Sequence, residues 1–78
     1  MKLVYPARFC KEKEGGYSVE VPDLKGCITQ GDTLEEAIEM AQDAALGWLL
    51  TSIEDEEDLP EASEIKDIKL DNKEQFVS

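Results

Sequence analysis

Two alternating stretches on either side of a glycine-ended loop constrain the fold of this chain more than any other feature. Apolar side chains recur at every second position over residues 3–11 and again over residues 17–21. This period of two is typical of half-buried strands. The loop Glu12–Gly16 ends in two glycines, which suits a hairpin connection. The sequence therefore predicts an antiparallel hairpin, with Pro6 restricting the first strand to a sheet edge or an outward-facing N–H.

The register of this hairpin is supported twice by the residues it pairs. A five-residue loop sets Phe9 opposite Val19, so that the apolar residues of both strands share one face. The same register sets Arg8 opposite Glu20 on the other face, where opposite charges attract. Two further pairs follow from it: Lys11 with Tyr17 and Ala7 with Val21.

A third strand and a helix are expected next. The turn Pro22–Gly26 precedes a short strand at Cys27–Gln30, in which we expect Ile28 to face the core. Thr33 and Glu36 have the spacing of a capping box, so a helix begins there and ends near residue 52 or 53. Its core-facing side is predicted from the 3.6-residue period: Leu34, Ala37, Ile38, Ala41, Ala44, Ala45, Trp48 and Leu49.

The elements add up to one small domain over residues 1–78, because a chain of this length supports a single core. Residues 1–53 hold the hairpin, the third strand and the main helix, and residues 54–64 form an acidic loop. Residues 65–78 form a closing segment, with a helical turn near 63–68 and a last strand from Gln75. The predicted fold class is α+β, a small antiparallel sheet with one packed helix in the order β-β-β-α-β.

A second apolar stripe lies on the C-terminal half of the helix. Leu46, Leu50 and Ile53 follow each other at i, i+4 and i+7, outside the core-facing side. One explanation is that Leu59, Ile65 or Ile68 folds back over them. The other is a contact with another chain, since an exposed apolar stripe usually marks an interface.

The charge of the chain excludes several functions. It has 8 Lys+Arg, 19 Asp+Glu and no His, a net charge of −11. Direct nucleic-acid binding needs clustered Lys and Arg, so we expect none, and no His-based catalysis or His metal site can exist. No apolar run approaches the ~20 residues of a membrane span.

The acidic residues are concentrated in one part of the chain. Residues 26–65 contain no Lys or Arg and 12 acidic residues, and the densest run is Glu54–Asp58. Such a run is either a solvated linker or a surface that meets a basic protein and speeds their encounter.

Nothing in the sequence favours catalysis or a cofactor. Glu20, Asp23 and Asp32 are the acids nearest the predicted sheet, and a metal-dependent nuclease would require them to converge on shared ions. Their spacing gives no sign of that, so we expect a non-enzyme without cofactor or metal. Cys10 and Cys27 do not form a disulfide framework, and with no leader at Met1 we expect reduced thiols and a cytoplasmic location.

Three motifs in order resemble the HicB antitoxin family. They are Tyr5-Pro6-Ala7, the turn Pro22-Asp23-Leu24-Lys25-Gly26-Cys27, and the helix start Gly31-Asp32-Thr33-Leu34-Glu35-Glu36-Ala37. The resemblance is strong over about residues 3–50 and looser from Leu59 onward. It implies a partial RNase H-like fold and the neutralisation of a HicA toxin, a small basic ribonuclease that cleaves mRNA with a His. The antitoxin domain would cover the RNA-facing surface and the catalytic His of that toxin.

The chain departs from the family pattern at its end. Many HicB proteins carry a C-terminal DNA-binding module, and no such segment follows Ser78. A naturally short member, a shortened chain and a proteolytic remnant would all look like this. Because an apolar strand begins at Gln75 just before the sequence stops, we expect a shortened chain.

The expected partner-binding residues belong to two regions. Turn and strand-end residues are exposed and rigidly held, which suits them to contact a toxin, although Tyr17 could instead be core and Asp23 a turn cap. The alternative function is a generic regulatory or oligomerisation domain, and a small core favours a dimer or tetramer in either case. The candidates are Tyr17, Asp23, Leu24, Thr29, Gln30, Glu54, Asp55 and Glu56.

Overall fold

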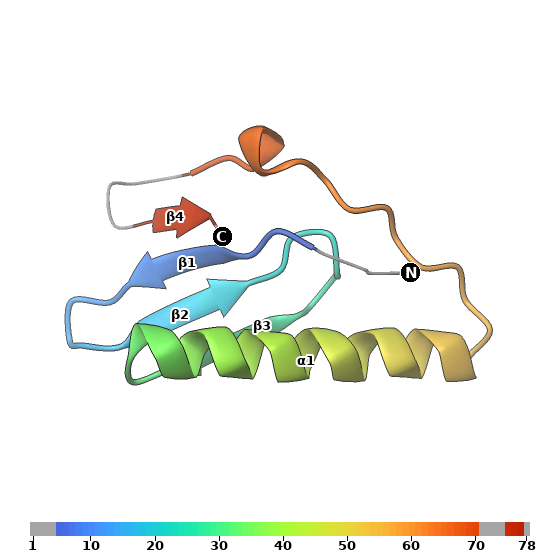
Figure 1. Ribbon diagram of the computed structural model, residues 1–78, viewed down its shortest axis with the longest axis horizontal. Coiled ribbons are helices and arrows are strands. Elements are labelled where there is room, and N and C mark those ends of the chain that lie inside the picture. The colour runs from blue at the N-terminus through green and yellow to red at the C-terminus, as the bar shows by residue number, and fades with distance from the viewer. Residues whose placement is uncertain (1–4, 71–74, 78) are drawn as a thin grey trace.

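A four-stranded antiparallel sheet carries one long helix on one face (Figure 1). The computed structural model describes residues 5–70 and 75–77. The strand order in the sheet is β3-β2-β1-β4. This is the predicted β-β-β-α-β arrangement, so the expected fold class is confirmed. The elements are β1 (Arg8–Lys11), β2 (Tyr17–Glu20), β3 (Ile28–Gly31), α1 (Leu34–Glu54), a 3₁₀ turn (Ile65–Asp67) and β4 (Gln75–Val77).

The predicted hairpin register is confirmed. Phe9 lies opposite Val19 and Arg8 opposite Glu20, and the Arg8 and Glu20 side chains form an ion pair. The glycines of the loop have positive φ, 100° at Gly15 and 82° at Gly16. The strand itself begins at Arg8, with Pro6 buried just before it. Residues 5–7, which were predicted to belong to this strand, lie outside it, and the predicted start at Leu3 lies outside the described residues.

The expectation that Ile28 faces the core is wrong. Thr29 pairs with Val19, so Thr29 lies on the helix-covered face and Ile28 on the opposite one. Ile28 is 65% exposed, while Cys27 before it is 6% exposed and joins the core. The reason is that alternate residues of a strand face the same side of the sheet. Cys27 and Thr29 share the side of the buried β2 residues, and Ile28, between them, faces the other side.

The helix begins as the sequence predicts. Thr33 is its N-cap, and the Thr33 hydroxyl accepts a hydrogen bond from the backbone N–H of Glu36 at 3.1 Å. The Glu36 side chain makes no return bond to Thr33 among the interactions of the described residues, so half of the capping box forms. Ala37 and Ala41 are buried against the sheet. The helix ends at Glu54, slightly beyond the predicted residue 52 or 53.

Close packing of α1 on the sheet depends on Gly31. A Cβ added at Gly31 would lie 2.4 Å from the backbone N of Ala37. The helix therefore covers β3 and β2 closely and leaves the far side of the sheet open. Two residues predicted to face the core, Leu34 and Ile38, are instead exposed at 38% and 37%, so the prediction is wrong for them.

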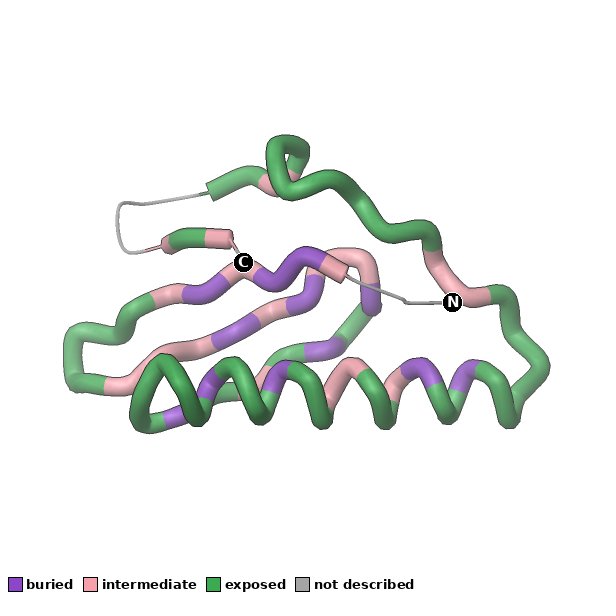
Figure 2. The backbone as a smooth tube through the Cα atoms, viewed as in Figure 1, coloured by how far each residue is buried: buried purple, intermediate pink, exposed green. Residues whose placement is uncertain are grey.

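The chain returns from α1 to β4 through a mostly exposed segment (Figure 2). The Tyr5 hydroxyl donates to the Pro60 carbonyl, and Arg8 Nη1 donates to the Lys69 carbonyl at 2.8 Å. β4 then pairs with β1, where the Phe76 ring stacks on Phe9 with centroids 5.2 Å apart. Within the described ranges, no helix is long and apolar enough to cross a membrane.

Candidate functional site

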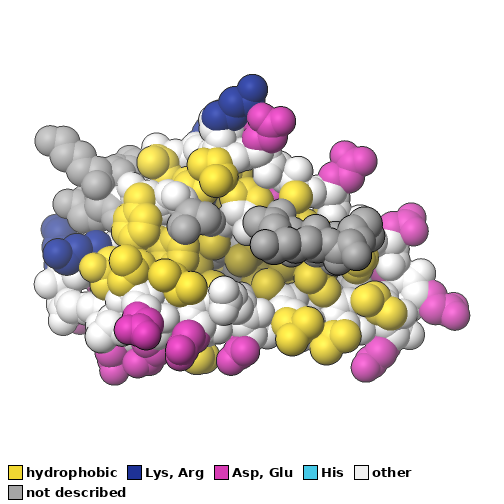
Figure 3. Space-filling view, viewed as in Figure 1, with side chains coloured by type: hydrophobic (Ala, Val, Ile, Leu, Met, Phe, Trp, Pro, Cys, Tyr) yellow, Lys and Arg dark blue, Asp and Glu magenta, His cyan; other side chains and the backbone are white. Residues whose placement is uncertain are grey.

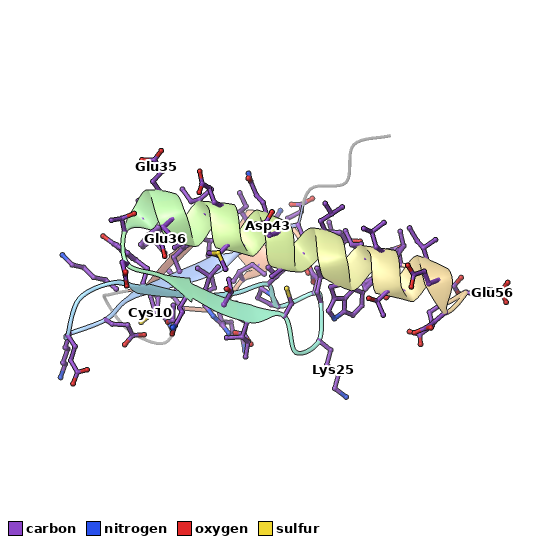
Figure 4. The ribbon with its side chains drawn as sticks, turned by 90° about the horizontal axis from the view of Figure 1, so that it is seen from below. Cys10, Lys25, Glu35, Glu36, Asp43 and Glu56 are labelled. Carbon is purple, nitrogen blue, oxygen red and sulfur yellow. The ribbon has the colours of Figure 1, made fainter. Side chains whose placement is uncertain are left out.

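A groove of about 510 Å³ lies between the start of β3 and one flank of α1. In Figure 4, Asp43 lies on the middle of α1, Lys25 on the turn below the helix, and Glu56 at the helix end. We name this depression the β3 groove. Its lining residues are Gly26, Cys27, Ile28, Asp43, Ala44, Gly47, Trp48, Thr51, Ser52, Asp55 and Glu57.

The walls of the β3 groove are held by the turn before β3. Trp48 Nε1 donates a hydrogen bond to the Lys25 carbonyl at 2.9 Å, which ties α1 to this turn. Gly26 has a φ of 80°, a conformation that favours glycine, and Cys27 N–H donates to the Leu24 carbonyl at 2.9 Å. These bonds fix the turn beside the groove against α1. Burial raises the pKa of the Cys27 thiol.

The two thiols are expected to react at different rates. A raised pKa leaves less thiolate at a given pH, and Cys27 is also 6% exposed, whereas Cys10 is half-buried. At pH 8 a disulfide reagent should therefore modify Cys10 about tenfold faster than Cys27 or more. The Cys10→Ser variant isolates the slow phase, and urea should make it fast. Equal rates in the native protein would contradict this burial.

Three acids line the β3 groove without a cationic partner. The ion pairs of the described residues join Arg8 to Glu20 and Lys66 to Glu64. Asp43, Asp55 and Glu57 are exposed and belong to neither. The groove thus combines apolar and small residues with unneutralised negative charge, which suits a basic ligand.

The acidic run also opposes the helix that it follows. The C-terminus of a helix is the negative end of its dipole, where each carboxylate costs about 0.3–1 kcal/mol. The last turn of α1 contains no basic residue, and acids follow it directly. Glu35 and Glu36, by contrast, lie in the first turn, where the dipole favours them. The acids at the start of α1 stabilise the helix through its dipole. The acids at its end destabilise the helix, so their presence there is not explained by stability.

The end of α1 adopts a left-handed turn at a residue other than glycine. Glu56 has a φ of 58°. Its N–H donates to the Ile53 carbonyl at 3.1 Å, and the Glu57 N–H donates to the Ser52 carbonyl at 2.9 Å. This is the pattern of a Schellman cap, which usually has glycine at the left-handed position. The turn directs the chain so that Glu57 lines the β3 groove.

Glycine at this position should stabilise the protein. Glu56→Gly relieves the left-handed strain, which costs about 1 kcal/mol, so Tm should rise by about 5 °C in a thermal melt. The matched control is Glu39→Gly, an exposed position inside the helix, which should lower stability by about 1 kcal/mol. A Tm for Glu56→Gly at or below that of the parent would contradict the assignment of this cap.

Three of the predicted contact residues are engaged within the chain. Tyr17 is half-buried and meets the Phe76 ring edge-on, with centroids 6.3 Å apart. Asp23 accepts two hydrogen bonds from Ser63, one from the backbone N–H at 2.8 Å and one from the hydroxyl at 2.6 Å. Leu24 is 1% exposed, so the expectation that this turn residue is exposed is wrong. The Leu24 N–H donates to the Val21 carbonyl within the turn, and the Leu24 side chain packs in the core cluster.

Of the other five predicted contact residues, Asp55 lines the β3 groove and the other four lie outside its lining. Thr29 is half-buried and Gln30 exposed, both on the edge strand β3. Asp55 lines the groove itself, and Glu54 and Glu56 flank it in sequence at the end of α1. The structure therefore joins two regions that were predicted separately, the third strand and the acidic run.

The acids considered for a metal-dependent nuclease are not gathered together. Glu20 is paired with Arg8, and Asp23 is bonded to Ser63. Within residues 5–70 and 75–77, no three His, Cys, Asp or Glu residues lie close enough to hold a metal ion.

Sequence reasoning missed the contribution of the middle of α1 to this site. Asp43, Gly47 and Trp48 line the groove, although Trp48 was expected only as a core residue. A signal for it exists in the sequence. Gly47 interrupts a helix, where glycine costs about 1 kcal/mol relative to alanine, and nothing lies within 4 Å of a Cβ added there.

The apolar stripe on the C-terminal half of α1 is uncovered. Leu46, Leu50 and Ile53 are 57%, 50% and 56% exposed, and Ile65 is itself 58% exposed. Leu59 packs against the core instead. The explanation that the C-terminal segment folds back over this stripe is therefore wrong. Figure 3 shows hydrophobic side chains at the surface along this part of the helix, at the lower right.

Sequence comparisons place the chain among antitoxins. The family model described as "HicB_like antitoxin of bacterial toxin-antitoxin system" matches residues 5–77. "Antitoxin HicB 1" of Photorhabdus laumondii is 46% identical over 56 residues, which is 72% of this chain and 36% of that protein. A phage protein of Haemophilus phage HP1 is 42% identical over 65 residues, 82% of this chain and 47% of that protein. The chain thus spans about a third to a half of the length of these curated relatives.

Solved structures share the fold. An antitoxin-system structure, "Toxin-Antitoxin complex from Streptococcus pneumoniae", matches with a TM-score of 0.86 and 23% identity over 100% of this chain and 67% of that chain. The N-terminal domain of antitoxin HicB from Burkholderia pseudomallei matches with a TM-score of 0.68 and 24% identity over 94% of each chain. These likenesses agree with the family match in sequence. The chain therefore belongs to the HicB-like antitoxin family of bacterial toxin–antitoxin systems.

Proposed function

We propose that this chain binds a small, basic, mRNA-cleaving toxin of the HicA type in the cytoplasm and neutralises it by covering its RNA-binding and catalytic surface. The observation that carries the proposal is the acidic end of α1, placed where it opposes the helix dipole and lines an open groove. A solved structure of the same fold bears the name "HicA3 and HicB3 toxin-antitoxin complex", which supports a toxin of that type.

The charge distribution favours competition with RNA. A toxin that binds RNA must present positive charge to phosphates. The stretch from residue 26 to 65, with 12 acids and no Lys or Arg, offers the opposite charge to that same surface. Long-range attraction speeds the encounter and is screened by salt, so association should slow markedly between low and physiological ionic strength.

Co-expression tests this function. The gene beside the one for this chain is expressed in Escherichia coli, alone and with this chain carrying an affinity tag. We expect the neighbouring product to be a basic protein that arrests growth alone, that loses toxicity with this chain, and that copurifies with it. A neighbouring product that stays toxic and does not copurify would contradict the proposal.

The apolar stripe supports self-association in addition. Leu46, Leu50 and Ile53 are exposed on one side of α1, and residues 44–53 contain no charged side chain. Two copies can therefore meet at the stripe without opposing their acidic groups, in spite of a net charge of −11 on each. We propose a dimer, or a tetramer built from it, held by helix–helix contact at this stripe.

A charge in the middle of the stripe should separate the copies. Leu50→Glu removes about 1.5–3 kcal/mol of apolar burial from each side of the contact and adds a desolvation cost, so the variant should be a monomer by sedimentation velocity at 50–100 µM. Leu70→Glu is the matched control, because Leu70 is 48% exposed and lies away from α1. Equal sedimentation of both variants and the parent would contradict self-association through the stripe.

A further inference from the structure

The free edge of β3 carries backbone hydrogen-bonding groups that are not used by the sheet. The N–H of Val21 donates to the Cys27 carbonyl at 3.0 Å. Hydrogen-bonded and non-hydrogen-bonded pairs alternate along an antiparallel ladder, so this bond determines which residues of β3 bond to β2. Thr29 and Gly31 have the same parity as Cys27 and pair with β2. The backbone N–H and C=O groups of Ile28 and Gln30 therefore point away from β2, at the edge of the sheet.

This edge lacks the usual protection against another strand. Edge strands are commonly guarded by Lys, Pro, bulges or a covering segment. β3 reads Ile-Thr-Gln-Gly, without charge or proline, and pairs without interruption over four residues. Ile28 is 65% exposed beside it, on the open face. The edge can therefore accept a short extended segment through two donors and two acceptors.

The β3 groove lies where the side chains of such a segment would go. An added strand runs about 4.8 Å beyond β3, and its side chains alternate between the two faces. Those on the helix side would face the groove flank of α1, where Gly47 leaves space and Asp43 offers a carboxylate. Those on the other side would lie beside Ile28. The fit is to an extended segment in which basic and apolar residues alternate.

The negative charge of the β3 groove favours a basic partner at the β3 edge over a second copy of this chain. Two copies paired edge to edge about a two-fold axis would bring two groove flanks together, each with Asp43, Asp55 and Glu57. Like charges placed opposite each other are destabilising, and no cation of the groove is available to relieve them. A basic segment meets the same acids favourably.

We propose that the β3 edge binds its protein partner by strand addition, taking an extended basic segment of the toxin whose alternate side chains enter the β3 groove. This inference rests on the proposed function and specifies how the partner is held. It assigns backbone pairing to Ile28 and Gln30 and charge selection to the groove acids.

Amide exchange tests the backbone pairing directly. The probe is the co-encoded toxin with its catalytic His replaced by Ala, and exchange is followed by NMR on labelled antitoxin. The amides of Ile28 and Gln30 should exchange fast in the free protein and at least about tenfold more slowly in the complex. The amides of Thr29 and Gly31, already bonded to β2, serve as internal controls with slow exchange in both states.

A proline variant tests the same contact by affinity. In Gln30→Pro the lost N–H is one that faces solvent, so the β2–β3 ladder is kept, and edge strands tolerate proline at such positions. We expect a rise in Kd of about tenfold or more, against less than about threefold for Gln30→Ala, which keeps the N–H. A melting curve for each variant verifies the fold.

The outcomes separate the two proposals. A complex that forms and neutralises the toxin while Ile28 and Gln30 exchange as in the free protein would overturn strand addition and leave the antitoxin function standing. Failure to bind any toxin would overturn both. Protection of these two amides in the free protein, rising with its concentration, would replace the toxin with a second copy of this chain.

Discussion

Gly31→Ala is expected to destabilise the domain by about 3 kcal/mol, the upper part of the range for overpacking. A Cβ at this position would lie 2.4 Å from the Ala37 nitrogen and 2.7 Å from its Cα, and both are backbone atoms that no rotamer change can move. Either β3 or the start of α1 must shift, which opens the core beside Ala37. Since 78 residues support roughly 4–12 kcal/mol of stability in total, the loss should be evident in urea unfolding.

Gly47→Ala is the matched control for this substitution. It adds the same methyl group to the same domain, but nothing lies within 4 Å of the new Cβ and the position is inside a helix. Stability should rise by up to about 1 kcal/mol. Equal unfolding midpoints for the two variants would show that close packing of β3 on α1 does not govern the stability of this fold.

Reversal of the three groove acids should weaken toxin binding about 100-fold at low ionic strength. Asp43→Lys, Asp55→Lys and Glu57→Lys together replace attraction by repulsion at the proposed contact, and like charges at an interface cost several kcal/mol. Most of the early loss should be in the association rate, measured by stopped flow over a range of salt concentrations. The fold should not suffer, since a lysine at Asp55 favours the helix dipole.

The control has the same change in charge elsewhere. Glu12, Glu14 and Asp67 are exposed and lie outside both the β3 groove and the acidic stretch 26–65, and their reversal to Lys also moves the net charge from −11 to −5, since three reversals add 3 × 2 = 6. At the same ionic strength, binding by this variant should stay within about threefold of the parent. If both triple variants lose affinity equally, total charge rather than the groove determines the association.

The parts of the fold that could be predicted were those supported by more than one sequence pattern or by a local interaction. The hairpin register was set by two pairings, Phe9 with Val19 and Arg8 with Glu20, and both are present. The helix start followed from Thr33 because a cap is a local interaction. Ile28 was misplaced because a four-residue strand offers too few alternations to fix its parity, and that parity depends on the turn at Cys27.

The site was only partly predictable, for a related reason. The acidic run and the third strand could be read separately, but only the packing of α1 across β3 places residues of both, Asp55 and Ile28, in the lining of one groove. Leu24 looked like an exposed turn residue because nothing local shows that its turn folds inward. Asp23 carries a carboxylate suited to a partner, yet Ser63, 40 positions later, already donates to it. Contacts between such distant positions leave no periodic pattern in a sequence.

The central claim is that this chain silences a toxin by occupying its RNA-facing surface. The most direct measurement is a titration of the purified chain into its co-encoded toxin during cleavage of a labelled mRNA. The cleavage rate should fall in proportion to added antitoxin and reach zero near one chain per toxin. Excess RNA should slow this inhibition by competition. Undiminished cleavage at a several-fold excess of folded antitoxin would contradict the claim.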